Sequence, residues 1–234
     1  MKVRIKFTKT GPVKFIGHLD TMRYFQKAVR RSELPAAFSG GYSPHMIMSF
    51  AAPLGVGMES LAEYFDMELT EEIPCDEIVE RLNREMADGF SVIQAAVAAE
   101  GKAGNAMALV AAADYLITFR EGKAPAGAWL EKLPEFLNQP VIETEKETKK
   151  GVRLIDIRPF IYEMKELDGG IFVRLASASS NYTRPDTVMK AFYAFLGEEM
   201  PEYAFQTRRL EVYADQGTEE APRFVTLLTA GEQK

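Results

Sequence analysis

The first residues of the chain alternate between charged and apolar side chains. Residues 2–8 carry valine, isoleucine and phenylalanine at every second position, which predicts a strand with one buried face. From about His18 to Ser32 the period becomes helical, and the helix is predicted to stop before Pro35. Four apolar residues are predicted to form the buried stripe of this helix: Leu19, Met22, Phe25 and Val29.

The pattern continues in the same way to about residue 98. Four further elements are predicted in this part of the chain: a strand at 46–51, a strand at 61–69, a helix at 73–88 and a strand at 90–98. The predicted order is therefore β-α-β-β-α-β, which is the ferredoxin-like pattern.

The second half of the chain roughly repeats this order. The predicted elements are a strand at 113–120, a helix at 126–138, a strand at 140–147, an irregular stretch, a strand at 171–177, a helix at 185–197 and a strand at 204–214. The segment FVTLL near the end is expected to add a strand or to dock.

The predicted fold class is α+β, with two ferredoxin-like (βαββαβ) units in tandem, mostly antiparallel sheets and helices on one face. The glycine-containing segment 101–105 is a plausible boundary. It divides the chain into an N-terminal domain of residues 1–103 and a C-terminal domain of residues 104–234.

The composition of the chain is typical of an ordinary globular protein. The chain has 234 residues, of which 47% are hydrophobic and 26% charged. A single cysteine, Cys75, excludes an internal disulfide and an iron–sulfur cradle of several cysteines. No apolar run approaches the length of a membrane helix, and the N-terminus has no signal-peptide core. We therefore expect a cytoplasmic protein with no membrane partner.

The charge is unevenly distributed along the chain. The total is −6, yet residues 1–50 carry a net charge of +7 and residues 51–100 a net charge of −10. A local basic block can attract an anionic partner even in an acidic protein. The same block can equally pair with the acidic block of its own domain.

The basic residues gather on the first predicted helix. On a helical wheel, four cations fall within about 100° of arc, with Asp20 between them: Arg23, Lys27, Arg30 and Arg31. One interpretation is a solvated face paired with the acidic segment that follows. The other is a face that contacts phosphates, which Lys9 and Lys14 would extend.

Both histidines lie in the first fifth of the chain. His18 is at the predicted start of the helix, where the helix dipole favours a neutral imidazole, which can serve as a general base, a metal ligand or a hydrogen-bond partner. His45 follows a loop containing Tyr42. Glu63 lies on the predicted strand 61–69. The candidate catalytic residues are His18 and His45, and the alternative is that GHLD is only a good helix start.

Metal and hydrolase chemistry is poorly supported. The histidines and carboxylates show no H-x-H or H-x-x-x-H spacing, so no metal site is predicted. The sequence contains no nucleophile elbow and no glycine-rich nucleotide fingerprint.

Residues 3–69 nevertheless carry a recognisable set of motifs. They are K-x-G-x-x-x-F-I-G-H-L-D-x-x-R, R-R, S-x-G-Y-x-P-H, S-F-A-x-P-L-x-x-G and E-Y, which here span Lys9 to Tyr64. The segment R-R-L-E-V-Y near the end of the chain also has the appearance of a family motif. In these motifs the chain resembles the bacterial radical-SAM-linked proteins, an uncharacterised family encoded beside, or fused to, radical SAM proteins. The resemblance implies a radical SAM partner that carries the iron–sulfur cluster and S-adenosylmethionine, with no cofactor on this chain.

Three functional hypotheses follow. The first is a non-catalytic accessory or substrate-binding module that works with a radical SAM enzyme and binds RNA, such as tRNA or ribosomal RNA, through the basic helix. The second is an RNA-processing or RNA-modifying enzyme with His18 as general base. The third is a protein-interaction subunit. The expected binding residues are Lys9, His18, Asp20, Arg23, Lys27, Arg30, Arg31, Tyr42, His45 and Glu63.

Overall fold

The computed structural model describes residues 1–99, 101, 104–148, 151–218 and 220–230. Two compact units account for the chain. Unit 1 comprises residues 1–111 together with 209–234, and unit 2 comprises residues 112–208. The predicted division at residue 103 differs from this partition in two ways. The linker up to residue 111 stays with unit 1, and the last 26 residues return to unit 1 because they pair with its strands.

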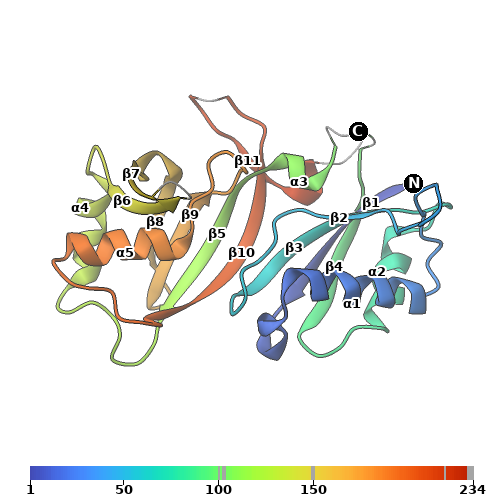
Figure 1. Cartoon of the computed structure of the whole chain (residues 1–234), viewed down its shortest axis with the longest axis horizontal. Coiled ribbons are helices and arrows are strands. Elements are labelled where there is room, and N and C mark those ends of the chain that lie inside the picture. Colours follow the sequence, from blue (N-terminus) through green and yellow to red (C-terminus); the bar gives the residue numbers. More distant parts are fainter. Residues whose placement is uncertain (100, 102–103, 149–150, 219, 231–234) are drawn as a thin grey trace. The chain divides into compact units, whose positions relative to one another are not determined.

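Unit 1 contains the element order predicted for the first half of the chain (Figure 1). Its first elements are β1 (Lys2–Lys9), the 3-10 helix η1 (Gly11–Phe15), α1 (His18–Arg31), β2 (Met48–Phe50), β3 (Glu59–Glu68), α2 (Cys75–Asn83) and β4 (Phe90–Val97). A short helix α3 (Ala106–Leu109) follows. The returning segment adds the end of β10 (Phe205–Asp215), β11 (Phe224–Thr226) and α6 (Leu227–Ala230).

The sheet of unit 1 is antiparallel around β1. β1 lies between β3 and β4, and β2 and β10 both pair with β3. The register pairs Ile5 with Phe65 and Phe7 with Glu63. Apolar residues of β1 and β3 therefore point to one face, where they form a core with Phe25 of α1 and Ile78 of α2. Figure 1 shows both helices on this face.

The buried stripe of α1 contains two of the four predicted residues, Phe25 and Val29, and Met22 is partly buried. Phe25, Ala28 and Val29 are buried, but Leu19 is 59% exposed. At 100° per residue, Leu19 lies about 120° from Phe25, which places it outside the face that meets the sheet. The prediction that Leu19 belongs to the core is wrong.

Unit 2 is also an antiparallel sheet with helices. Its elements are β5 (Val110–Phe119), η2 (Trp129–Lys132), α4 (Leu133–Leu137), β6 (Glu143–Thr148), β7 (Gly151–Asp156), η3 (Arg158–Phe160), β8 (Ile161–Leu167), β9 (Gly170–Ala176), α5 (Pro185–Phe195) and the start of β10. β5, β9 and β8 are neighbours in that order, and β10 pairs with β5. β6 and β7 form a separate two-stranded hairpin.

Two predictions for this half need correction. The stretch predicted to be irregular contains two strands, β7 and β8. They are strands because β7 pairs with β6 and β8 pairs with β9, whereas their own hydrophobic periodicity is weak. The helix predicted at 126–138 is shorter, since a 3-10 turn comes first and the α-helix begins at Leu133, followed by Pro134. The mixed α+β class with a mostly antiparallel sheet is confirmed.

Candidate functional site

The N-terminal end of α1 holds the first candidate histidine. Gly17 is the N-cap, and its carbonyl accepts hydrogen bonds from the backbone N–H and the hydroxyl of Thr21, both at 3.0 Å. His18 is half-buried, and its ring meets Phe50 edge-on with centroids 5.6 Å apart. The GHLD segment is thus a helix start, and it holds the imidazole against the end of β2.

Lys9 ends β1 beneath the same helix start. Its side chain is buried, and Nζ donates a hydrogen bond of 2.6 Å to the carbonyl of Ile16. Burial lowers the pKa of the Lys9 amino group, and the negative charge of Glu63 partly opposes this shift. The group therefore binds its proton less tightly than a surface lysine does.

Glu63 on β3 is buried beside them. Its Oε1 accepts a hydrogen bond of 2.9 Å from Nη1 of Arg209, and the same Nη1 donates to the carbonyl of Ala52 at 2.8 Å. Arg209 is itself almost fully buried. The partner of Glu63 thus comes from 146 residues further along the chain. The only sequence signal for Arg209 is the R-R-L-E-V-Y motif.

These groups meet around one small pocket. Its lining residues are Phe7, Lys9, His18, Thr21, Phe50, Pro53, Leu54 and Glu63. Three predicted site residues, namely Lys9, His18 and Glu63, are therefore brought together by the fold. The pocket holds about 10 Å³, which is room for about one water molecule. An amino group, an imidazole and a carboxylate around it can donate and accept hydrogen bonds and can exchange protons through such a water.

His45 lies elsewhere in the same unit. It is exposed, its Nδ1 is 2.8 Å from the hydroxyl of Ser39, and its backbone N–H donates to that hydroxyl at 3.1 Å. It lines a different pocket, beside Met48 and Asp66. Tyr42 is fully exposed in the same loop. The two histidines thus line separate pockets, and the loop of Tyr42 is closed on itself by Ser39.

The cations of α1 have different partners. Arg23 pairs with Asp20 of its own helix at 3.2 Å, and both side chains are about two-thirds exposed. Arg31 pairs with Glu85, with Nε 2.7 Å from the carboxylate and Nη2 3.1 Å from the backbone carbonyl. Lys27 and Arg30 are exposed, and in the described part of the chain they form no ion pair.

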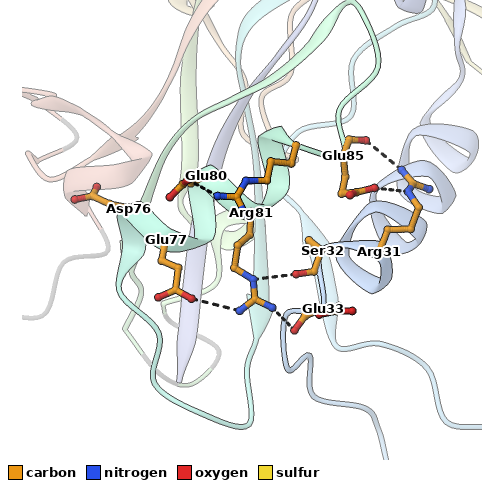
Figure 2. Close-up of a pocket in the computed structure, with 9 residues that line it drawn as sticks. Arg31, Ser32, Glu33, Asp76, Glu77, Glu80, Arg81 and Glu85 are labelled. Carbon is orange, nitrogen blue, oxygen red and sulfur yellow. Dashed lines mark hydrogen bonds and ion pairs between the residues drawn. The ribbon is translucent and has the colours of Figure 1, made fainter.

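An exposed groove separates the end of α1 from α2. Figure 2 shows Arg81 of α2 reaching across it, where Nε donates to the carbonyl of Ser32 at 2.9 Å and Nη2 donates to that of Glu33. On the α2 side, Glu77 pairs with Arg81 at 3.4 Å, and Glu80 pairs with Arg84. Two acidic residues of α2, Glu77 and Glu80, are therefore paired with arginines of the same segment, Arg81 and Arg84.

Two buried polar networks were not predicted. Arg4 on β1 is 1% exposed and pairs with Asp66 through both carboxylate oxygens. Glu211 on β10 accepts hydrogen bonds of 2.6 Å from Lys6 and from the hydroxyl of Tyr64. The polar face of β1, expected to be solvated, is largely covered. No periodicity could reveal this, because its cover comes from β10, α3 and α6.

The described residues contain no group of three or more His, Cys, Asp or Glu side chains placed to hold a metal ion. Within the same residues, no helix is both long and apolar enough to cross a membrane.

Comparisons with known proteins complete the description. No curated protein matches the chain. A chain of a solved structure, described as "Crystal Structure of a Cbf5-Nop10-Gar1 Complex", aligns with a TM-score of 0.45 and 11% identity. The alignment covers 90% of this chain but only 48% of that one, and at this TM-score it carries no argument about fold or function. The family model DUF2344, described as "Uncharacterized protein conserved in bacteria", matches residues 2–185. Since this match covers most of the chain, the protein belongs to the DUF2344 family of uncharacterised bacterial proteins.

Proposed function

We propose that this protein is a non-catalytic accessory module that works with a radical SAM protein and binds RNA through helix α1. The link to a radical SAM protein rests on the motif resemblance of residues 3–69. On this proposal, the partner supplies the iron–sulfur cluster and S-adenosylmethionine, and this chain supplies a binding surface.

The RNA proposal rests on the exposure of Lys27 and Arg30 on α1. Glu77 and Glu80 of α2 pair with Arg81 and with Arg84, which directly follows the helix. Among the residues that the structure describes, the acidic segment pairs with one cation of α1, through Arg31 and Glu85. Lys27 and Arg30 keep their charge exposed. A row of exposed cations on one helix face favours contacts with the phosphates of a nucleic acid.

We also propose that each unit is ferredoxin-like. The elements of unit 1 follow the order β1-α1-β2-β3-α2-β4, with β4, β1, β3 and β2 as successive neighbours. In unit 2, β5, α4, β8, β9, α5 and β10 follow the same order, with the β6–β7 hairpin inserted after α4. Such sheets are a common support for RNA, although fold alone is a weak warrant for function.

The RNA part is tested by charge reversal. We expect fluorescence anisotropy at low salt to show binding of tRNA or of ribosomal RNA fragments. The double variant Lys27→Glu/Arg30→Glu should bind at least tenfold more weakly, because two phosphate contacts become repulsive. Lys190→Glu is the matched control, since Lys190 is an exposed lysine on helix α5. Absence of binding at low salt, or equal affinity of the double variant and the control, would overturn this part.

The partner is tested separately. Co-expression with a radical SAM protein from the same organism should give a complex that survives purification, and cross-linking should place the contact. If this chain elutes alone at micromolar concentration, the accessory role is excluded. RNA binding is then decided by the charge-reversal experiment alone. A complex that forms without RNA binding would instead favour a protein-interaction subunit.

One observation favours a second candidate function. Lys9, His18 and Glu63 surround the same pocket, which is an arrangement suited to proton transfer during RNA processing or modification. Incubation of candidate RNAs with the wild type and with His18→Ala, followed by mass spectrometry of the nucleosides and gel analysis of the fragments, tests it. Identical products from the two proteins would exclude His18 as a general base.

A further inference from the structure

Large apolar side chains remain exposed at the N-terminal end of α1. Phe15 at the end of η1 is 65% exposed, Leu19 in the first turn of α1 is 59% exposed, and Val56 in the loop before β3 is 65% exposed. A backbone hydrogen bond of 2.9 Å from Gly57 to the carbonyl of Lys14 joins the neighbours of Val56 and Phe15. Folding of this unit therefore leaves an apolar surface at one end of the helix.

The Phe15 ring is held at the surface by its surroundings. Val13 of the same 3-10 helix is buried and anchors the segment, while Lys14 pairs with Glu59 at 3.5 Å. The ammonium group of Lys14 lies 5.5 Å from the centroid of the Phe15 ring. A ring fixed in this way loses little conformational entropy when another flat group stacks on it.

This apolar surface is continuous with the basic face of α1. Taking Leu19 as the origin of a helical wheel, Arg30, Arg23 and Lys27 follow within about 80° of arc. Arg23 and Lys27 are about 6 Å apart along the helix axis, and Lys27 and Arg30 about 4.5 Å apart. One exposed stripe thus begins with apolar side chains and continues with three cations.

We infer that this stripe binds single-stranded rather than double-stranded RNA, with a base stacked on Phe15 beside Leu19 and the backbone along Arg23, Lys27 and Arg30. The inference rests on the RNA binding proposed above. Double-stranded RNA keeps its bases stacked within the helix and presents phosphates and 2′-hydroxyls. No base of a duplex is therefore free to stack on an exposed aromatic ring. Proteins that bind single strands combine a basic track with aromatic rings on which bases stack.

The experiment compares two RNAs with the full chain. One is a single strand of about 12 nucleotides, and the other is the same strand annealed to its complement. Fluorescence anisotropy at low salt should show at least fivefold tighter binding of the single strand. For three phosphate contacts, the log–log salt dependence of the single strand should have a slope of about −2, and Lys27→Ala should reduce its magnitude by about 0.7.

Phe15→Ala separates stacking from charge. We expect it to weaken binding of the single strand about fivefold or more, which is the range of base–aromatic stacking, and to leave duplex binding unchanged. Met107→Ala is the matched control, because Met107 is an equally exposed apolar residue on α3. Circular dichroism should confirm that both variants fold, as each removes an exposed side chain.

The outcomes distinguish this inference from the function on which it rests. If neither RNA binds at low salt, the proposed function fails and the inference fails with it. If both RNAs bind equally and Phe15→Ala behaves as the wild type, the inference is overturned while RNA binding stands. If Phe15→Ala loses the radical SAM partner but not the RNA, the apolar surface is a protein interface and the inference is likewise overturned.

Discussion

Arg4 and Asp66 form a buried ion pair with two hydrogen bonds, from Nε to Oδ1 at 2.8 Å and from Nη2 to Oδ2 at 3.0 Å. Arg4 also donates to the carbonyls of Gly104 at 2.6 Å and Leu227 at 2.7 Å. Asp66 in turn accepts a hydrogen bond of 2.8 Å from the backbone of Ala106. This one pair therefore joins β1, β3, the segment before α3 and the C-terminal segment of unit 1.

Truncating either partner should destabilise unit 1 strongly. Asp66→Ala leaves the buried Arg4 without its carboxylate partner, and Arg4→Ala leaves the buried Asp66 with Lys2 at 3.6 Å in place of its two hydrogen bonds to Arg4. We expect each change to cost about 3–5 kcal/mol of the free energy of unfolding. Urea unfolding followed by circular dichroism measures this. Asp20→Ala is the control, because the exposed Asp20–Arg23 pair should contribute less than about 1 kcal/mol. Equal losses in the two cases would contradict the structural role of the Arg4–Asp66 pair.

The lowered pKa of Lys9 should give stability a specific dependence on pH. Between the lowered pKa of the folded state and the ordinary value of 10.5, the unfolded chain binds more protons than the folded chain. The free energy of unfolding should therefore rise with pH in this window. Lys9→Met lacks this titration, so the stability of the wild type relative to Lys9→Met should increase as the pH rises toward 10.5.

The comparison between these two proteins cancels the tyrosines, which titrate in both. The control is Lys27→Met, which removes an exposed lysine and keeps Lys9, so its stability relative to Lys9→Met should show the same rise with pH. A flat difference between the wild type and Lys9→Met would show that Lys9 titrates as a surface lysine.

Arg81 should stabilise the C-terminal end of α1. Its guanidinium donates to the carbonyls of Ser32 and Glu33, which follow the last turn of the helix (Figure 2). Arg81→Ala removes both hydrogen bonds and should lower the free energy of unfolding by about 1–2 kcal/mol. Arg84→Ala, directly after the same helix, removes an exposed pair with Glu80 and should cost less than about 0.5 kcal/mol. Two variants of equal stability would contradict the capping role.

Asn83 should protect the edge of the sheet. β4 is an edge strand without a charged residue, and the Asn83 amide bonds both the N–H and the C=O of Val92 at 2.8 Å. Asn83→Ala should lower stability by about 1 kcal/mol and should promote self-association, because unpaired strand edges attract other strands. Analytical ultracentrifugation tests the second effect, with exposed Gln94→Ala as the control. A variant that stays monomeric at all concentrations would show that the edge is blocked by other means.

Much of the fold could be predicted from local patterns. The helices observed at 18–31 and 185–195 and the strands at 59–68, 90–97 and 170–176 lie within a few residues of their predicted positions. The strands at 151–156 and 161–167 could not be predicted, because their periodicity is weak and their partners define them.

The sequence predicts several residues of the candidate site but not how they are arranged. Lys9, His18 and Glu63 were singled out, and the structure places them around one pocket. The sequence leaves open whether His18 and His45 share a site, and in the structure His45 lines another pocket. Arg209, which binds Glu63, was missed because its partner is 146 residues away.

The sequence by itself determined the alternation of strands and helices, the helix start at Gly17-His18 and the row of cations on α1, since each depends on spacing within one or two turns. The tertiary structure decided which charges are buried and which remain available. Arg4 and Arg209 are buried because strands far apart in the chain cover them, whereas Lys27 and Arg30 stay exposed because they lie on the face of α1 opposite to the one that packs on the sheet. Such pairings depend on register and on loop closure, which no local pattern encodes.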